Sequence, residues 1–247
     1  MKNSLPLYNT YRQRLSGTDL FQGLPVKLID DMLAHFRLET WNKGSVHDCR
    51  IALKRFYVIV DGRMELLQTH PLTGKQVAIL ILRPGDVYDV LSLLDSREHK
   101  VIPGALDDLQ LFSAPIDEVR RWIFDHPEFN RNFMPYLARQ IRNREMLATD
   151  LALYDTDTRL ARLILRYATL DGEPDDSMGN GIEAKLLHGL SNEKLAQMIG
   201  SARQVVNRHL QAMKREGVLH SEKHRLIIDD LRKLRERAEA LQADFLY

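Results

Sequence analysis

The densest group of side chains that could read a nucleic acid lies near the C-terminus. The segment 203–208 contains two arginines, a glutamine and an asparagine: Arg203, Gln204, Asn207 and Arg208. In the major groove of DNA, arginine can bridge guanine O6 and N7, and glutamine or asparagine can bridge adenine N6 and N7. Their spacing places all four in the first turns of one helix. The group therefore predicts a helix that reads base edges.

A shorter helix is expected just before this reading helix. Ser191 can cap it, and Leu195, Ala196 and Ile199 recur at the spacing of one buried helical face. Gly200 then supplies the residue type that most often ends a helix. The segment 191–200 therefore predicts a short helix with a tight exit.

The reading helix itself is expected over residues 202–216, capped by Ser201 and ended by Gly217. Its inward face would consist of Val206, Leu210 and Met213. Lys214 and Arg215 lie further along the helix, where contact with DNA phosphates is the expected role. Two short helices joined at a glycine can place the second one in the major groove.

The segment 218–229 predicts two strands about a polar turn, which is the wing of a winged helix. Lys223, His224 and Arg225 would lie at its tip, within reach of the DNA backbone. The alternative for the whole unit is a helical hairpin with a solvated charged face. His220 and His224 are four residues apart, but a strand and turn do not place them on one helical face as metal ligands.

Composition supports a local nucleic-acid surface and excludes several other classes. The chain of 247 residues has a net charge of +1, with a single cysteine and 44% hydrophobic residues. Residues 191–240 contain eleven Lys or Arg against seven Asp or Glu, an excess of four positive charges. The sequence has no phosphate-cradling glycine loop and no nucleophile elbow, which argues against an enzyme. It also lacks a secretory signal and an apolar stretch of about 18 residues, so a cytoplasmic location without membrane contact is expected.

The first half of the chain predicts β structure after a short helical lead-in. Strands are expected at 56–60, 64–67 and 77–82, where β-branched, aromatic and aliphatic residues gather. Turn signals follow at Asp61-Gly62 and at Pro84-Gly85-Asp86. Short strands separated by turns predict a sandwich or roll.

A long helix is expected from Pro127. Apolar residues recur near helical spacing along one stripe: Phe133, Leu137, Ile141, Leu147, Leu151 and Tyr154. Either the β unit or the same helix of a second subunit could cover this stripe. A further helix is expected over 158–170, followed by a polar, exposed loop at 171–181.

The segment from Leu195 to Leu210 resembles the helix-turn-helix of the Crp/Fnr family of bacterial transcription regulators. Arg203 and Arg208 fall on the family's two DNA-contacting arginine positions. Residues 56–62, 74–75 and 83–86 look like its cyclic-nucleotide-binding β-roll. The resemblance implies an α+β fold with a jelly-roll-like β-roll sensor at 1–126, a long dimerisation helix at 127–155 and a winged helix-turn-helix at 156–247.

This sequence departs from the family pattern both in the DNA-reading helix and after the Pro-Gly-Asp turn of the β-roll. Gln204 stands where many members have glutamate, and Asn207 stands where glycine or serine is usual. Cyclic-nucleotide binders of the family follow the Pro-Gly-Asp turn with Gly-Glu and then Arg-Ser. Here the acid is displaced to Asp89 and no Arg-Ser pair appears. A cyclic phosphate would lack its bidentate clamp, which argues against cyclic AMP.

The signal that controls the protein is not identified by the sequence. An iron-sulfur cluster is excluded, because such clusters need about four cysteine ligands and only Cys49 is present. His47 or Cys49 could serve as an axial haem ligand, Cys49 could be a redox switch, or the pair could lie in an ordinary surface loop. His47, Cys49 and Asp89 are therefore the signal-sensing candidates.

The resulting hypothesis is a homodimeric transcription regulator that binds a roughly palindromic duplex and responds to a signal in the β-roll. Its DNA contacts would come from Ser201, Arg203, Gln204, Asn207, Arg208, Lys214, Arg215 and Lys223. RNA polymerase is the expected protein partner, to be recruited or blocked at the promoter. The alternative is a ligand-binding regulatory module that acts through protein-protein contacts.

Overall fold

The computed structural model describes residues 5–169, 182–223 and 225–239. The chain divides into two compact units, Met1–Arg144 and Glu145–Tyr247. Helix α5 (Pro127–Leu153) is continuous and contains the point of division. The two units are described in turn.

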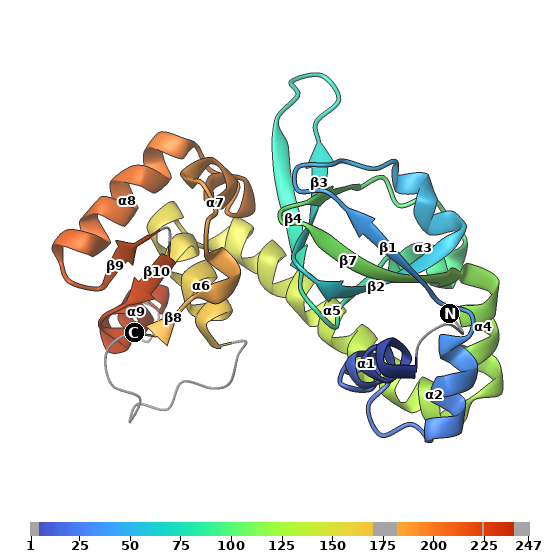
Figure 1. Cartoon of the computed structure of the whole chain (residues 1–247). Coiled ribbons are helices and arrows are strands. Elements are labelled where there is room, and N and C mark those ends of the chain that lie inside the picture. The colour runs from blue at the N-terminus through green and yellow to red at the C-terminus, as the bar shows by residue number, and fades with distance from the viewer. Residues whose placement is uncertain (1–4, 170–181, 224, 240–247) are drawn as a thin grey trace, which may run out of the picture. The chain divides into compact units, whose positions relative to one another are not determined.

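The N-terminal unit is built on two antiparallel sheets (Figure 1). The four-stranded sheet has the order β1 (Arg37–Trp41), β7 (Leu109–Pro115), β2 (Arg55–Asp61), β5 (Val87–Tyr88). The three-stranded sheet has the order β4 (Gln76–Leu82), β3 (Met64–Thr69), β6 (Ile102–Ala105). The strands predicted at 56–60, 64–67 and 77–82 are confirmed as parts of β2, β3 and β4. The expected α+β fold with an N-terminal β-roll is confirmed as well.

The side chains of β2 alternate between the two faces of the four-stranded sheet, and both faces are covered. Tyr57 and Ile59 belong to the core that also contains residues of the three-stranded sheet, such as Leu66. Phe56 and Val58 belong to the second core, which the helices supply. Because side chains alternate between faces along a strand, one continuous apolar run serves two cores.

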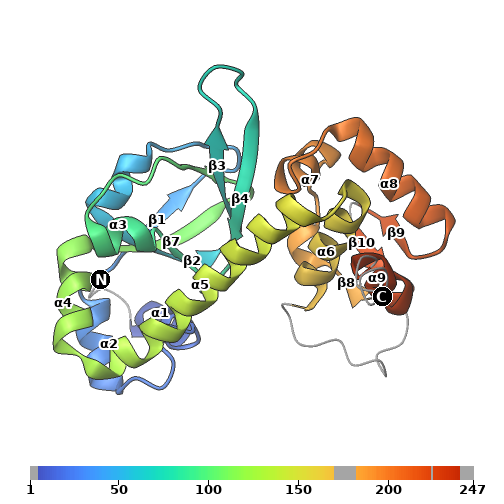
Figure 2. The ribbon, with the colours of Figure 1, turned by 180° about the vertical axis from the view of Figure 1, so that it is seen from behind.

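Helices cover the outer face of the four-stranded sheet. They are α1 (Leu5–Ser16), α2 (Val26–Leu33), α4 (Ile116–Asp125) and the first half of α5, with α3 (Val90–Asp95) and the 3-10 turn Cys49–Leu53 completing the unit. Figure 2 shows α1, α2, α4 and α5 gathered on this side of the β-roll. Phe36 and Trp122 pack at 5.5 Å between ring centroids, and Trp122 meets Phe129 of α5 at 6.1 Å. This aromatic cluster fixes the start of α5 to its own unit.

The prediction of one apolar stripe along α5 is wrong in its extent. Phe133 is fully buried in the helix-side core together with Tyr136, whose hydroxyl accepts a hydrogen bond from the Val87 amide at 3.0 Å. By contrast, Ile141 is 52% exposed. Tyr154 lies beyond the end of the helix, with its ring 4.5 Å from the Arg162 guanidinium. Helical spacing alone does not distinguish turns that are covered by the same unit from turns that are left exposed.

The turn at 83–86 contains an acid whose protonation is coupled to folding. The Asp86 carboxylate accepts a hydrogen bond from the Arg83 amide at 2.9 Å. Burial nevertheless raises the pKa of Asp86 to about 6. The folded state therefore favours the neutral carboxyl, and its stability falls as the pH rises from about 4 to about 6.

Asp86→Asn should therefore stabilise the protein at pH 7 by about 1–3 kcal/mol, because asparagine keeps the acceptor and removes the charge. Urea unfolding at pH 7 and at pH 4 measures the effect, and the gain should disappear at the lower pH. Asp125→Asn, at an exposed position, is the control. An Asp86→Asn variant that gains no stability at pH 7 would contradict this assignment.

The C-terminal unit combines helices with a small sheet of order β8-β10-β9. After the end of α5, its elements are α6 (Thr156–Thr169), β8 (Ile182–Glu183), the 3-10 turn Lys185–Leu187, α7 (Asn192–Met198), α8 (Arg203–Arg215), β9 (Leu219–Glu222), β10 (Arg225–Ile228) and α9 (Leu231–Ala238). The predicted helix 158–170 corresponds to α6, which begins two residues earlier. Residue 170 and the predicted loop 171–181 lie outside the described residues. Strand β8 and helix α9 had no counterpart in the sequence prediction.

Candidate nucleic-acid interface

Helix α7 forms as the sequence predicts. The Ser191 hydroxyl accepts a hydrogen bond from the Lys194 amide at 3.2 Å and so caps the helix. Leu195, Ala196 and Ile199 are buried. The predicted cap and the predicted inward face are both confirmed.

The turn between α7 and α8 differs from the prediction in one residue. Gly200 adopts a positive φ of 64°, and the Ser201 amide donates to the Ala196 carbonyl at 2.9 Å. This pattern is a Schellman motif, which uses Ser201 to end α7. Helix α8 starts one residue later, with Ala202 at its N-cap and no side-chain cap. The prediction that Ser201 caps α8 is therefore wrong.

The buried face of α8 consists of Val206, Leu210 and Met213, as predicted. Gly217 ends the helix with a positive φ of 67°, and the Val218 amide donates to the Met213 carbonyl at 2.9 Å. The same motif thus ends both helices, at the two glycines that the sequence singled out.

The exposed face of α8 brings the predicted reading residues together. Arg203, Gln204, Asn207 and Arg208 are all exposed and lie in the first two turns of the helix. Gln211 is also exposed, four residues after Asn207, and the sequence analysis missed it. Its helical spacing was the available signal. These five side chains are called the reading face below.

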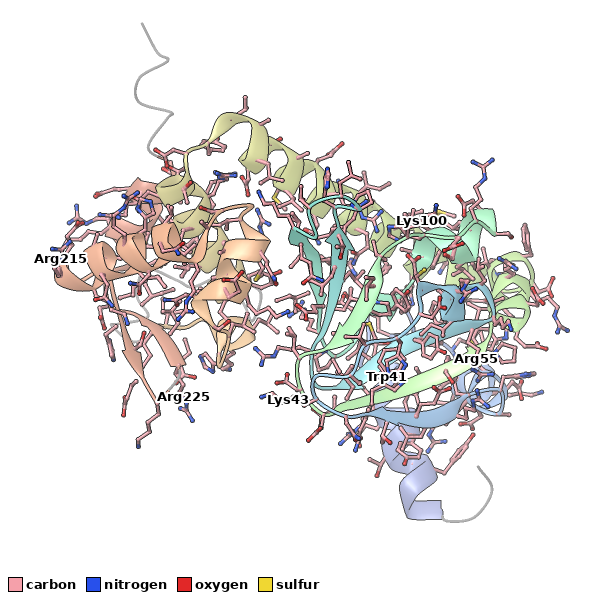
Figure 3. All side chains as sticks on the ribbon, turned by 90° about the horizontal axis from the view of Figure 1, so that it is seen from above. Trp41, Lys43, Arg55, Lys100, Arg215 and Arg225 are labelled. Atoms are coloured by element: carbon pink, nitrogen blue, oxygen red, sulfur yellow. The ribbon has the colours of Figure 1, made fainter. Side chains whose placement is uncertain are left out.

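Cations flank the reading face. Arg215 is exposed at the end of α8 and Lys214 is half-buried beside it. Figure 3 shows Arg215 on α8 and Arg225 on the wing, both directed away from the body of their unit. Lys223 is exposed at the tip of the wing with a positive φ of 47°. Arg225 forms an ion pair with Glu183 at 3.2 Å, so part of its charge is neutralised.

The wing is confirmed as an antiparallel pair, with Arg225 opposite Glu222 in the register of β9 and β10. His220 lies on β9 and contacts the Asp229 carboxylate at 2.8 Å. His224 lies outside the described residues. The strand assignment of His220 agrees with the expectation that the two histidines do not share a helical face.

Side chains from α6 and α9 hold α8 in place from behind. His209 of α8 contacts Asp157 of α6 at 2.9 Å. Arg237 of α9 contacts the same carboxylate at 2.9 Å and also forms an ion pair with Glu216, the C-cap residue of α8. The backbone of the reading helix is therefore fixed to two neighbouring helices, which favours precise presentation of its exposed side chains.

A hollow of about 230 Å³ lies between α7, α8 and the wing. Its lining combines leucines with polar residues, namely Asn192, Asn207, Gln211, Lys214, Ser221 and Arg225. Asn192 and Asn207 are joined there by a hydrogen bond from Nδ2 of Asn192 to Oδ1 of Asn207 at 3.1 Å. Sequence reasoning did not find Asn192, because the contact joins separate helices.

Among the signal-sensing candidates, Asp89 has a local structural role. Its buried carboxylate caps α3 through the Leu91 amide at 3.2 Å and accepts from the Ser92 hydroxyl at 3.0 Å. His99 Nδ1 lies 2.9 Å from the same carboxylate. Burial raises the pKa of Asp89, but the hydrogen bond and charge of His99, with the other two bonds, outweigh burial and lower the pKa overall. Asp89 is thus satisfied by groups of its own unit.

Cys49 and His47 lie in different surroundings. The Cys49 thiol donates to the Glu98 carboxylate at 3.4 Å, and burial together with Glu98 raises its pKa. A protonated thiol is a poor metal ligand and a slow redox group. His47 stacks on Trp41 at 3.7 Å between ring centroids, and burial lowers its pKa against an opposing pull from Glu39.

The candidates therefore do not form one cluster. Cys49 and Asp89 contact the adjacent residues Glu98 and His99, whereas His47 packs on Trp41. Within the described part of the chain, no group of three His, Cys, Asp or Glu side chains could hold a metal ion. A haem ligand role for His47 or Cys49 stays a prediction. None of the helices described is long and apolar enough to cross a membrane.

Two helices joined at a glycine, a buried inward face and a β-hairpin wing define the C-terminal unit as a winged helix-turn-helix domain. A model of the Crp-like helix-turn-helix domain matches residues 158–237. A CRP-like cAMP-activated global transcriptional regulator of Mycobacterium tuberculosis is 27% identical over 184 residues, which cover 74% of this chain and 80% of the relative. A global nitrogen regulator of Synechococcus elongatus is 29% identical over 180 residues, 71% and 77% of the two chains.

A solved structure of a mutant CooA from Carboxydothermus hydrogenoformans has the same fold, with a TM-score of 0.69 at 21% identity over 84% of this chain and 90% of that one. The chain thus contains a Crp-like helix-turn-helix domain and is similar over most of its length to transcription regulators of the Crp/Fnr family. Its function is DNA-binding transcription regulation. Because this family consists of regulators, the prediction that the chain is not an enzyme is confirmed.

Proposed function

We propose that the protein recognises a specific, roughly palindromic duplex as a homodimer and regulates transcription there in response to a signal in the β-roll. The observation that carries this proposal is the reading face of α8. Arginine side chains and amide side chains share one exposed surface of α8. Val206, Leu210 and Met213 are buried on the opposite surface. A helix of this kind fits the major groove, where each base pair has a distinct pattern of donors and acceptors.

Each contact residue has a role that follows from its chemistry. Arg203 and Arg208 would each bridge guanine O6 and N7, while Gln204 and Asn207 read neighbouring base edges. Lys214, Arg215 and Lys223, together with the Ser201 hydroxyl in the turn, would contact phosphates and fix the register. The predicted ranges correspond to proposed tasks, with 1–126 sensing the signal, 127–155 dimerising and 156–247 binding DNA.

Exposed apolar residues of α5 support the proposed dimer. Met134 and Ile141 are seven residues apart and are 49% and 52% exposed, and Leu151 is 41% exposed. With Leu137 and Ala148 these residues occupy five of the six a and d positions of a heptad repeat over residues 134–151, and Arg144 occupies the sixth. Such a seam is covered when the same helix of a second subunit packs against it. The two reading helices would then enter successive major grooves about 34 Å apart.

Replacing Ile141 with arginine should weaken this dimer by roughly tenfold or more, since symmetry would bury two unpaired charges at one seam. Sedimentation velocity measures the shift from dimer to monomer, and affinity for the duplex should fall with it. Asn143→Arg adds the same charge on the other side of α5 and should leave the dimer intact. A wild-type protein that is monomeric while bound to its preferred duplex would refute the seam.

The signal proposed for this chain differs from that of its cAMP-activated relative. The chain lacks the Arg-Ser pair expected for a cyclic phosphate, and Asp89 is engaged by Leu91, Ser92 and His99. We propose that a different effector, or a covalent signal, acts on the β-roll and changes the packing of α5. The bound regulator would then recruit or block RNA polymerase, which implies work in the cytoplasm on chromosomal DNA.

Selection from a pool of random duplexes tests the proposal. The wild-type protein should enrich a consensus with inverted half-sites, and an Arg203→Ala/Arg208→Ala variant should not. The spectrum of the same preparation reports on haem through a Soret band. A folded wild-type protein that enriches no sequence even at low salt would overturn the proposal and favour a module that acts through protein-protein contacts.

A further inference from the structure

The hydrogen bond between Asn192 and Asn207 connects the first residue of α7 to the reading face of α8. Asn192 Nδ2 donates to Asn207 Oδ1 at 3.1 Å. Directly beside this pair, Leu195 of α7 and Leu210 of α8 are buried and line the same hollow. The two helices that carry the asparagines are thus held together by their own apolar contacts.

This bond restricts what Asn207 can offer to a base. A carboxamide carries an acceptor oxygen and a donor NH₂ group on different sides of one carbon atom. When Oδ1 is directed to Asn192 on α7, the amide plane turns Nδ2 to the other side. Bidentate recognition of adenine needs both atoms to face the same base edge. The structure therefore favours Nδ2 as the group that Asn207 presents to DNA.

We infer that Asn192 is a positioning residue that sets the base preference of Asn207. With Nδ2 presented, Asn207 donates to a keto acceptor and prefers guanine (O6 and N7) or thymine (O4). Cytosine presents an amino donor there, so it is rejected, and adenine loses the advantage of a bidentate contact. The inference rests on the proposed function, because it specifies how one residue of the reading face selects its base.

DNA binding should strengthen the role of Asn192. In the free protein both asparagines lie at the surface, where water competes for their polar atoms. A base edge packed against the reading face excludes that water, and an acceptor left without a partner at the interface is unfavourable. Asn192 supplies a donor for Oδ1 from within the protein, so the amide enters the groove already oriented.

The test uses the full chain and its selected duplex, with each base pair replaced in turn by the other three. In wild type, one position of each half-site should prefer guanine or thymine through Asn207. Asn192→Ala should raise the relative affinity for adenine there by about tenfold, since the released amide can make both contacts. Asn192→Asp should shift the preference to bases with an amino group, because the carboxylate accepts from Nδ2 and turns Oδ1 to the DNA.

A double-mutant cycle separates positioning from a direct contact by Asn192. Asn207→Ala should remove discrimination at that position, and Asn192→Ala/Asn207→Ala should behave like Asn207→Ala alone. Glu193→Gln changes the neighbouring residue of α7 and should leave every base preference unchanged. Circular dichroism melting checks that each variant folds. If Asn192→Ala does not fold, the test relies on Asn192→Asp instead.

The outcomes distinguish this inference from the proposed function. If wild type selects a duplex and neither Asn192 variant changes the preference at any position, the inference fails and the proposed function stands. A wild-type preference for adenine at the Asn207 position would also overturn the inference. If the wild-type protein binds all duplexes with the same affinity, both the inference and the proposed function fail.

Discussion

Replacing Asp150 with alanine should destabilise the C-terminal unit by about 2–4 kcal/mol. Asp150 lies in the last turns of α5 with only 7% of its side chain exposed, and both oxygens are engaged from α6. Arg162 Nε lies 2.6 Å from one oxygen and Arg166 lies 2.6 Å from the other. Removing the carboxylate leaves two adjacent guanidinium groups that repel each other without their shared partner.

The expected loss is smaller than for a fully buried network, because Arg162 and Arg166 keep 27% and 22% of their side chains exposed. Arg162 also donates to the Ala238 carbonyl at 3.2 Å, so the same side chain ties α9 to this cluster. Removal of Asp150 should therefore loosen both α5 and α9 from α6.

Chemical unfolding followed by circular dichroism measures the Asp150→Ala effect. Asp150→Asn keeps an acceptor without the charge and should lose less. Thr149→Ala, at an exposed position on the same helix, controls for the change in helix propensity. If Asp150→Ala unfolds at the same denaturant concentration as Thr149→Ala, the cluster does not stabilise this unit.

Replacing Arg208 with alanine should reduce affinity for the preferred duplex by about 1–3 kcal/mol and remove the preference for guanine at one position of each half-site. Arg208 is exposed in the second turn of α8. The residues that follow it are fixed, because His209 contacts Asp157 at 2.9 Å and Leu210 is buried. The backbone below Arg208 is thus anchored, which keeps the guanidinium available for a two-point contact.

Two further variants separate base reading from charge. Arg208→Lys keeps the charge but not the planar fork, so it should retain much of the affinity and lose most of the guanine discrimination. Lys214→Ala should weaken binding to all sequences about equally and reduce the salt dependence by about one phosphate contact. Fluorescence anisotropy against a panel of single-base variants measures all three. Unchanged guanine discrimination in Arg208→Ala would refute its role as a base reader.

Local sequence signals were sufficient for the elements that present the reading face. Glycine is favoured where the chain needs a positive φ, so Gly200 and Gly217 predicted both helix ends correctly. The spacing of Val206, Leu210 and Met213 predicted the buried face of α8. The residues on the opposite side of the helix were therefore predicted to be exposed. The cap at Ser201 was predicted wrongly because the closing motif of α7 already uses that residue.

Contacts between distant residues could not be predicted in the same way. The Asp150 cluster depends on how α5 meets α6, and the Asn192–Asn207 bond depends on how α7 crosses α8. Periodicity specifies which face of a helix is apolar, but it does not specify which neighbour covers that face. For the same reason the helical spacing predicted that Phe133 and Ile141 share one apolar stripe, although Phe133 is buried in its own unit and Ile141 is exposed.

Sequence selection by the reading face of α8 is tested by the ratio of dissociation constants for the selected duplex and a scrambled duplex of equal length, measured across a range of salt concentrations. We predict a ratio of about a thousand or more at physiological salt, with both affinities falling as salt rises. A ratio near one at every salt concentration would show that only phosphates are bound and would refute sequence selection by α8.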